Sequence, residues 1–417
     1  MGNLKEQLAV NGGPALIGNG LKNRFNIGEE EKAAVMAMFD KAMETGQAPG
    51  YNGAEEDQLC SDFAEFMGGG YADGVNSGTT AVYVALRALD IEPFSEVIVS
   101  PVTDPGGIMP IVMSNCIPVV ADASPGCYNT DAGQIEKMIT EHTRAIIVSH
   151  IMGEAADMPS IMALAEKHGL KVLEDCAQAH GCKLNGQYVG TFGDVAAFST
   201  MFGKHFNTGG QGGMVFTKSE DTYWRVRQYA DRGKPFGLPE GSTNCVASLN
   251  FNLSDMGAAI GIVQLKKLKG LIESRRKVID SLREKFASLK TIDVPEIPDN
   301  SEPSFWYWRL RYNEGILDCD KIEFLTAVEA EGVKVLKDYS FARPFLMDWM
   351  VNKKAFGTGG FPWTAPQYKG SFTEGFDLPN VADSLGRSFN LHVYESWGEA
   401  EAELIFRAFE KVEKAYS

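Results

Sequence analysis

Short apolar runs alternate with amphipathic stretches through the first half of the chain. The apolar runs are rich in valine and isoleucine and have the length of strands. They cover residues 96–101, 117–122, 144–150, 170–175, 194–200 and 212–218. Helical periodicity marks residues 29–43, 131–142 and 156–169. Because buried strands that alternate with helices are typical of βαβ units, the pattern predicts an α/β fold with a mostly parallel sheet covered by helices.

The pattern changes from residue 254 onward. Residues 254–289 have the spacing of one long helix or of two in tandem, with Gly270 as a candidate break. A strand at 305–313, a helix at 318–332 and a charged amphipathic helix at 400–416 are predicted to follow. This second part therefore indicates a separate, smaller α+β unit.

Two domains account for these patterns. We expect a large domain over residues 1–270, which begins with a glycine-rich arm at 1–30, and a small domain over residues 271–417. Residues 343–381 are rich in proline, glycine and aromatic residues, and we expect irregular loops there.

Composition and charge narrow the class of protein. The chain has 417 residues, of which 44% are hydrophobic and 23% charged, which is enough for a globular protein with a sizeable core. No apolar run reaches the roughly 18 residues of a membrane span, and the first residues lack the basic start and apolar run of a signal peptide. The formal net charge of −16 argues against nucleic acid or an anionic membrane as a partner. We therefore expect a cytoplasmic protein.

The cysteines are odd in number, scattered and without a CxxC pair. They are Cys60, Cys116, Cys127, Cys176, Cys182, Cys245 and Cys319. Such a set argues against a disulfide framework and against a structural zinc site. We expect reduced thiols and no bound metal.

Glu174 and Asp175 stand at the end of a predicted buried strand. In open α/β sheets, ligands lie outside the carboxyl ends of the strands. A carboxylate in that position is able to pair with a pyridinium nitrogen and so to keep a cofactor ring electron-poor. An isolated strand-end aspartate, however, more often caps the next turn.

Lys204 follows another predicted strand and precedes the glycine-rich turn 208–213. A lysine in a desolvated position has a lowered pKa and becomes a nucleophile toward an aldehyde. Taken alone, such a lysine is more often an exposed turn residue, and the glycines match neither a Walker A motif nor a Rossmann fingerprint.

Residues 76–81, Asn-Ser-Gly-Thr-Thr-Ala, open a predicted helix. Small hydroxyl residues and a glycine at a helix N-terminus form an anion site, because the backbone N–H groups and the helix dipole point at the anion. Ordinary helix capping is the commoner role of such a sequence.

The order of these three groups resembles that in the DegT/StrS-type sugar aminotransferases, a branch of the fold-type I enzymes that use pyridoxal 5'-phosphate (PLP). The segments that carry the resemblance are NSGTTAVYVALRAL, EVIVSP, TRAIIVSHIMGEAADMPSIMALAEKHGLKVLEDCAQAHG, GTFGDVAAFST, Lys204 with GGQGGMVFT, and NFNLSDMGAAIGIVQLKKL. The resemblance runs from about residue 25 to about residue 290 and continues more faintly to the C-terminus. It is specific, because several segments must match in order.

The resemblance implies a role for each matching residue around the cofactor ring. Lys204 would hold PLP as a Schiff base and move the proton between cofactor and substrate. Asp175 would pair with the pyridine nitrogen, and Gln178 would contact the phenolic oxygen of the ring.

The resemblance also implies a phosphate site and a partner. Gly78, Thr79 and Ser199 would bind the cofactor phosphate. Asn250 would reach across a homodimer interface to the phosphate of the neighbouring subunit, so that two copies share their active sites.

Three positions depart from the family pattern. Asp104 falls where the family has an aromatic residue that stacks on the cofactor ring, and a carboxylate is unable to stack and needs a polar partner if buried. Asn252 falls where the family has arginine, and residues 103–110 replace a helix start made of small residues. These departures leave the cofactor site in place and bear on the substrate.

Other residues have two possible roles. His205 beside Lys204 is a candidate for assisting proton transfer, but a structural role is the commoner one for it and for His180. The aromatic segments 305–308 and 361–363 are candidates for lining a sugar or cyclitol pocket, although core packing is the commoner role.

The predicted reaction is transamination from glutamate or glutamine to a nucleotide-linked keto-sugar or to a keto-cyclitol. A related PLP enzyme that removes a hydroxyl from a deoxysugar is one alternative, but such members tend to carry histidine in place of Lys204. A non-catalytic sensor that binds PLP or an amine is another. Asp104 and Asn252 favour the sensor, whereas the set of Asp175, Gln178 and Lys204 counts against it.

Overall fold

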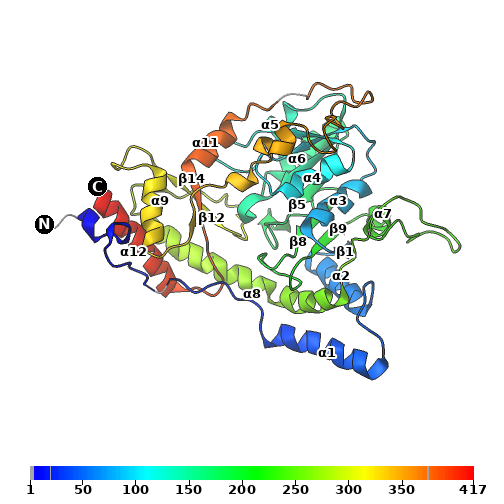
Figure 1. The fold of residues 1–417 in the computed structure, drawn as a ribbon, viewed down its shortest axis with the longest axis horizontal. Coiled ribbons are helices and arrows are strands. Elements are labelled where there is room, and N and C mark those ends of the chain that lie inside the picture. The colour runs from blue at the N-terminus through cyan, green and yellow to red at the C-terminus, as the bar shows by residue number, and fades with distance from the viewer. Residues whose placement is uncertain (1–3, 19, 373–374) are drawn as a thin grey trace.

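A seven-stranded sheet forms the centre of the computed structural model, which describes residues 4–18, 20–372 and 375–417 (Figure 1). The strand order is β1-β9-β8-β5-β4-β2-β3. The strands are β1 (Tyr71–Val75), β2 (Glu96–Val99), β3 (Ile117–Val120), β4 (Thr143–Ser149), β5 (Lys171–Asp175), β8 (Val195–Ser199) and β9 (Gly213–Thr217). β9 pairs antiparallel with β1 and with β8, and the other neighbouring strands pair parallel. The predicted mostly parallel sheet is confirmed.

Helices cover both faces of this sheet, because its strands are apolar on both sides. Val97 and Val99 of β2 pack into one cluster with α3 and α4, while Ile98 between them packs into another with α6. This alternation follows from the two-residue period of a strand. The covering helices are α2 (Ala54–Phe66), α3 (Gly78–Ala88), α4 (Pro105–Met113), α5 (Ala132–Glu136), α6 (Met158–His168) and α7 (Glu220–Ala230).

A second, smaller unit holds an antiparallel sheet in the order β10-β12-β14-β13. Its strands are β10 (Ile292–Asp293), β12 (Trp308–Tyr312), β13 (Val335–Leu336) and β14 (Ser388–Leu391). Its helices are α9 (Lys321–Ala330) and α12 (Glu399–Tyr416), whereas α10 (Asp348–Val351) and α11 (Pro379–Arg387) bury their apolar residues against the large sheet's core. The predicted α+β unit is thus confirmed. Three short strands, β6 (Lys183–Leu184), β7 (Gln187–Tyr188) and β11 (Ser301–Glu302), form a third sheet.

One continuous helix, α8 (Asp255–Phe286), runs beneath both units (Figure 1). Gly270 does not interrupt it. Leu265 and Leu268 pack with the large sheet's core, whereas Val278 and Leu282 pack in the core of the second unit. The domain boundary at residue 270 stays a prediction, but the core changes along this helix.

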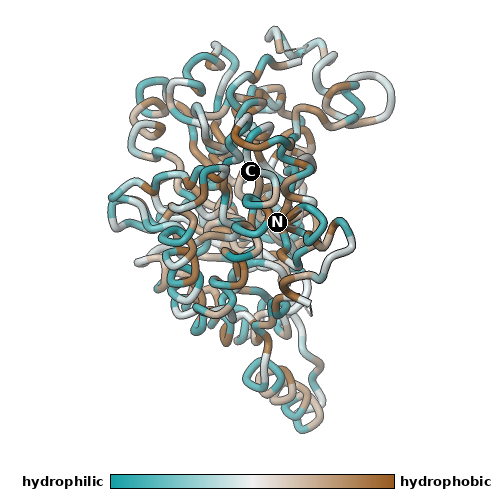
Figure 2. The backbone as a smooth tube through the Cα atoms, turned by 90° about the vertical axis from the view of Figure 1, so that its left-hand side faces the viewer, coloured by the Kyte–Doolittle hydropathy of each residue, from teal (hydrophilic) through white to brown (hydrophobic). Residues whose placement is uncertain are grey.

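The N-terminal arm packs mainly on the second unit. Leu8, Ile17 and Leu21 join that unit's hydrophobic core, so the two chain ends lie side by side (Figures 1 and 2). Helix α1 (Glu29–Thr45) follows the arm and stands away from the body in both views. Short 3-10 helices lie at Leu4–Gln7, Ala9–Asn11, Ile151–Gly153, Ser340–Ala342 and Pro344–Leu346. Residues 1–3 and 19 of the predicted arm are outside the described residues.

Two predicted elements differ from the structure. The helix expected over 131–142 is only α5, because the chain after it is drawn to the sheet edge. Thr140 and Thr143 donate their hydroxyls to the Glu96 carboxylate, and Glu96 N–H donates to His142 O at 3.0 Å. Within 343–381, whose residues 373–374 are not described, the loops are mostly irregular as expected but contain α10 and the start of α11.

This loop segment packs back on the large sheet. Trp363, Tyr368, Leu378 and Val381 are buried in the same cluster as Val97 and Val99 of β2. Among the described residues, no helix is long and apolar enough to span a bilayer.

Candidate active site

The carboxyl ends of β5 and β8 bring the two central residues of the predicted site to one edge of the sheet. Asp175 ends β5, and Lys204 lies in the loop that follows β8. Asp175 and Lys204 are each only 7% exposed. The N–H of Ala177 donates to Asp175 Oδ1 at 3.1 Å, which fixes the carboxylate at the strand end. The geometry therefore joins an amine and a carboxylate in a largely dry place.

Burial sets the ionisation of both groups. It lowers the pKa of Lys204 from 10.5 to about 8, although the charges of Asp175 and Asp104 act in the opposite direction. Burial also raises the pKa of Asp175, against the effects of the Ala177 N–H and the Lys204 charge. An amine with a pKa near 8 has a substantial neutral fraction at physiological pH, so Lys204 is a competent nucleophile.

Trp306 from the second unit lies against this lysine. Lys204 Nζ stands 3.8 Å from the centre of the Trp306 ring, within cation–π range. Trp306 Nε1 donates to Gly203 O at 3.2 Å, which fixes the ring beside the lysine. The aromatic segment 305–308 thus has two roles: Trp306 lies at the site, whereas Phe305 and Trp308 are core residues.

The predicted phosphate residues lie together at the start of α3. Ser77 caps this helix by accepting from Thr80 N–H, and Gly78 is its first residue. A Cβ on Gly78 would lie 2.5 Å from the Cβ of Ser199, so only glycine lets the helix N-terminus approach the end of β8 this closely. Thr79 is exposed beside them. The free N–H groups and dipole of α3 favour an anion at this point.

The start of α4 forms the floor between the phosphate residues and Asp175. A Cβ on Gly107 would lie 2.9 Å from Asp175 Oδ2, and one on Gly106 would meet Thr79 Oγ1. A Cβ at either position would clash, so only glycine lets the start of α4 approach Thr79 and Asp175 this closely. Asp104 is exposed and caps α4 by accepting from Gly106 N–H at 2.9 Å, so its carboxylate has the polar partner and the solvent that a buried one would lack.

Gln178 is held in one orientation. Its Oε1 accepts from Met152 N–H at 2.9 Å, and its Nε2 donates to the hydroxyl of Tyr339 at 3.1 Å. These two contacts fix the orientation of the amide, and Nε2 carries a second hydrogen that they leave unused. Tyr339 is 1% exposed and comes from an irregular segment of the second unit, so no pattern in the sequence pointed to it.

Asn250 is exposed near the end of β1. Its Oδ1 accepts from the backbone N–H of Asn252 at 3.1 Å and from the side-chain Nδ2 of Asn252 at 2.7 Å. The segment is anchored by Phe251 O, which accepts from Asn76 N–H at 2.7 Å. Asn250 therefore lies on a surface that a second copy is able to reach, and its contact across a dimer stays a prediction.

The two histidines lie in the core behind the lysine loop. Their rings are 5.6 Å apart and pack with Phe206 and Phe198. Burial lowers the pKa of His180 to about 3 and holds the pKa of His205 well below its ordinary value. His205 Nε2 contacts Ser304 O at 3.1 Å. Both are thus neutral, which favours a structural role.

His150, Glu174 and Cys176 form a buried group of ligand-type side chains. Glu174 accepts from His150 Nε2 and from three backbone N–H groups of the turn at 190–193. His150 Nδ1 accepts from Ala156 N–H, and burial raises the pKa of Cys176 well above its ordinary value. Because these lone pairs are committed or protonated, the group holds the turn together rather than a cation.

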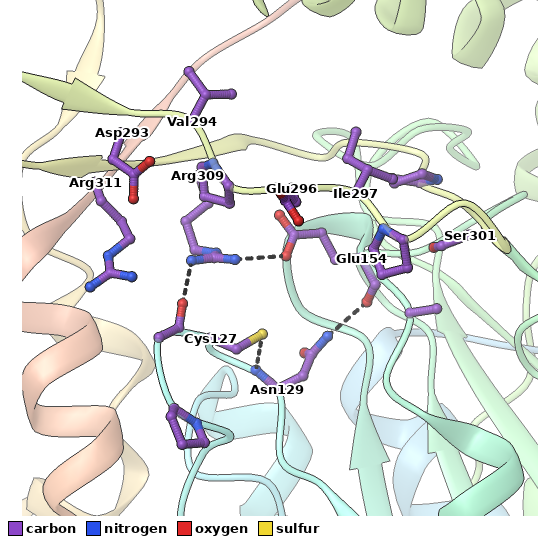
Figure 3. Close-up of a pocket in the computed structure, with 16 residues that line it drawn as sticks. Cys127, Asn129, Glu154, Asp293, Val294, Glu296, Ile297, Ser301, Arg309 and Arg311 are labelled. Carbon is purple, nitrogen blue, oxygen red and sulfur yellow. Dashed lines mark hydrogen bonds and ion pairs between the residues drawn. The ribbon is translucent and has the colours of Figure 1, made fainter. Parts of the chain in front are cut away.

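Two cavities border the two units. One of about 400 Å³ opens beside the Lys204 loop and is lined by Asn23, Arg24, Asn26, Met201, Phe202, Gly203, Arg275, Trp306, Tyr307, His392 and Tyr394. The other, of about 500 Å³, lies between the loops after β3 and β4 and residues 293–303 (Figure 3). There Arg309 pairs with Glu154 at 3.2 Å and donates to Gly126 O at 2.9 Å, which fastens the two units together.

Known proteins share this sequence and this architecture. The sequence profile of the DegT/DnrJ/EryC1/StrS aminotransferase family matches residues 28–410. A GDP-perosamine synthase of Caulobacter vibrioides is 31% identical over 277 residues, which are 65% of this chain and 72% of that protein. An L-glutamine:2-deoxy-scyllo-inosose aminotransferase of Micromonospora echinospora is 29% identical over 370 residues, 86% of each protein. The X-ray structure of an aminotransferase from Psychrobacter cryohalolentis matches with a TM-score of 0.82 and 26% identity, over 95% of this chain and 99% of that one, which confirms the fold-type I architecture.

Proposed function

The chain belongs to the DegT/DnrJ/EryC1/StrS aminotransferase family, and from this we propose that it moves an amino group from glutamate or glutamine to a nucleotide-linked keto-sugar or to a keto-cyclitol. Aminotransferases of this family depend on PLP. The observation that carries the proposal is the buried Lys204 amine, with a pKa of about 8, at the same sheet edge as Asp175.

The residues at this edge fit PLP in chemistry. The glycines at 106 and 107 bring the start of α4 close to Thr79 and Asp175, and the N-terminus of α3 suits a phosphate. When bound, the cofactor supplies an electron sink for the reacting carbon. Asp175 would hold the proton of the ring nitrogen at its carboxylate. The second N–H of Gln178 would donate to the ring's phenolic oxygen.

Lys204 has two tasks in this proposal. Its neutral Nζ would form the covalent link to the cofactor aldehyde, and after release it would carry the proton between the cofactor and substrate carbons. A pKa of about 8 suits both tasks, because the amine gains and loses a proton near the working pH. Trp306 covers Nζ and keeps water from that side.

The cavity beside the Lys204 loop is the place we propose for the acceptor. Trp306, Tyr307 and Tyr394 offer ring faces, and Asn23 adds a polar amide, a mixture that suits a hydroxylated ring. The names of two relatives, a GDP-perosamine synthase and a 2-deoxy-scyllo-inosose aminotransferase, support a sugar or cyclitol acceptor. The second name also supports glutamine as the donor.

We further propose a homodimer in which Asn250 reaches the partner's phosphate site. Exposed apolar side chains support an interface, since Phe25 is 78% and Met43 75% exposed on or beside the projecting α1, and Leu249 next to Asn250 is 68% exposed. Light scattering after gel filtration tests the mass. We also propose a cytoplasmic location, which the unpaired cysteines support, because free thiols persist in a reducing compartment.

Borohydride reduction followed by peptide mapping tests the central claim. We expect the reduced cofactor on Lys204, and Lys204→Ala to lose transamination while it still binds PLP through the phosphate contacts. Donors are then scanned by the loss of the absorbance of the lysine-linked cofactor. Cofactor on another lysine, or turnover in the alanine variant, would overturn the proposal. A deoxygenated product would favour the related PLP enzyme that removes a hydroxyl from a deoxysugar.

A further inference from the structure

We propose that Arg24, from the N-terminal arm, is a positioning residue for Lys204: it holds the backbone on both sides of the lysine and ties it, through Glu395, to the second unit. The proposal rests on the proposed function for the part that Lys204 plays with the cofactor. The clamp itself is a property of the chain and is testable without that chemistry.

The guanidinium of Arg24 spans the lysine. Arg24 Nη1 donates to Gly203 O at 2.7 Å, and Nη2 donates to His205 O at 3.2 Å. These are the carbonyls of the residues immediately before and after Lys204. Because a guanidinium is a rigid planar fork, it fixes the separation and direction of the two carbonyls at once. The lysine backbone is therefore held from a segment about 180 residues earlier in the chain.

A buried ionic chain continues from Arg24. Arg24 Nε pairs with Glu395 Oε1 at 2.7 Å, and Arg275 Nη2 pairs with Glu395 Oε2 at 2.8 Å. The side chains are 11%, 4% and 2% exposed for Arg24, Glu395 and Arg275. Burial alone would raise the pKa of Glu395, but Arg275 and Arg24 hold it below its ordinary value. Glu395 is thus ionised and fully engaged between two arginines.

The same chain holds the ring that covers the lysine. Arg275 Nη1 donates to Phe305 O at 2.9 Å and to Trp306 O at 3.1 Å. Trp306 in turn donates to Gly203 O, the carbonyl that Arg24 also contacts. The lysine backbone and the ring against its Nζ are therefore fixed by one set of contacts, which joins the arm, α8 and the second unit.

Stability alone is a poor explanation for this arrangement. A buried ion pair often adds little to the free energy of unfolding, because desolvation offsets the attraction, and its better-attested use is to fix one geometry. Under the proposed function Lys204 needs such a geometry, since its Nζ would release and re-form the same covalent link to the cofactor in every cycle. A displacement of about 1 Å is able to slow such a step about a hundredfold.

The experiment compares Arg24→Met with Arg24→Lys and with a matched control, Arg276→Met. Arg276, on the same α8 as Arg275, also makes one ion pair and two carbonyl contacts, to Glu302 and Pro303, but none to the lysine loop. Three measurements are made: amide hydrogen exchange of residues 201–206, the rate at which cofactor-free enzyme forms its covalent link to added PLP, and kcat and KM for transamination. Thermal unfolding reports the general cost of each substitution.

We expect Arg24→Met to speed amide exchange in 201–206 and to slow covalent PLP capture and kcat about ten- to a hundredfold, with a smaller change in KM. Arg24→Lys keeps the charge but reaches fewer acceptors, so its exchange and capture rates should lie between those of wild type and Arg24→Met. Arg276→Met should lower the unfolding temperature similarly and leave both loop measurements unchanged. Wild-type exchange and capture rates in Arg24→Met, or equal losses in Arg276→Met, would overturn the proposal.

The two claims fail in different ways. If Lys204 does not bind the cofactor, borohydride mapping fails for the wild type, while the exchange measurement still decides the clamp. If the clamp is wrong, Lys204 is labelled normally and exchange in 201–206 does not respond to Arg24→Met. Should Arg24→Met be too unstable to purify, Arg24→Lys carries the same comparison.

Discussion

Replacing Lys204 by methionine is expected to stabilise the cofactor-free protein at neutral pH, although it removes the amine on which activity depends. Methionine is unbranched and similar in length to lysine, and its thioether keeps the contact with the Trp306 ring without a charge. Lys204 is 7% exposed, and burial lowers its pKa from 10.5 to about 8. At about 1.4 kcal/mol for each tenfold change, folding the charged lysine costs about 3 kcal/mol.

The sign of the pH dependence follows from proton binding. Between the folded pKa of about 8 and the unfolded value of 10.5, the unfolded chain keeps a proton that the folded protein has released, so wild-type stability rises with pH there. The cost is fully present below that window and absent above it. The advantage of Lys204→Met is therefore at most about 3 kcal/mol at neutral pH and fades through the window. The attraction between Lys204 and Asp175 is already among the causes of the Lys204 pKa, so this figure includes it.

Urea unfolding from about pH 7 to about pH 10 measures the effect, with each variant compared with wild type at the same pH. Lys218→Met is the control, since Lys218 is an exposed turn residue after β9 and its removal should change stability little at any pH. Stability curves for wild type and Lys204→Met that stay parallel over this range would refute the claim that the lysine is charged at a cost in the folded state.

Substitutions at four other positions test separate parts of the site and the fold. Gly78→Ala should lower the free energy of unfolding by about 1–3 kcal/mol and weaken PLP retention, because the new Cβ would meet Ser199. Gly270→Ala, in the open middle of α8, should instead raise the free energy of unfolding by about 0.5–1 kcal/mol. Chemical denaturation measures the stability of both variants, and PLP titration measures retention. Asn250→Ala should speed cofactor loss in dialysis without changing the mass of the dimer, and wild-type retention would exclude a cross-subunit contact. Asp104→Asn keeps the cap on α4 but removes a charge that raises the pKa of Lys204, so the pH at which covalent PLP capture is half-maximal should fall, and an unchanged or higher value would contradict this.

The strands around the site were predictable because each is encoded locally. The apolar runs that end at Asp175 and Ser199 needed only valine- and isoleucine-rich strand length and a polar end. Their adjacency then follows from the parallel fold, which places successive carboxyl ends at one edge. The phosphate residues at 78 and 79 followed from a helix start, which is also a local signal.

The contacts that complete the site were not predictable, because they join distant segments. Trp306 reaches Lys204 and Tyr339 reaches Gln178 only through the packing of the second unit on the first. Arg24 lies in an arm without periodicity, so nothing near it in the sequence indicated that it contacts Gly203 and His205. The early end of α5 was not predicted for the same reason, since Glu96 on another strand draws residues 140–143 away from the helix.

The departure from the family at position 252 gains a physical meaning from these contacts. Asn252 donates twice to Asn250 Oδ1, and its own Oδ1 accepts from Asn52 Nδ2 at 3.2 Å. The oxygen of Asn250 is therefore occupied, which leaves its NH₂ group, the donor that a phosphate requires, for a further contact. An arginine at position 252 would add a charge at this surface, whereas asparagine contributes orientation. Anion binding by a second copy would thus depend here on the direction of one amide, and the departure is compatible with a working phosphate contact.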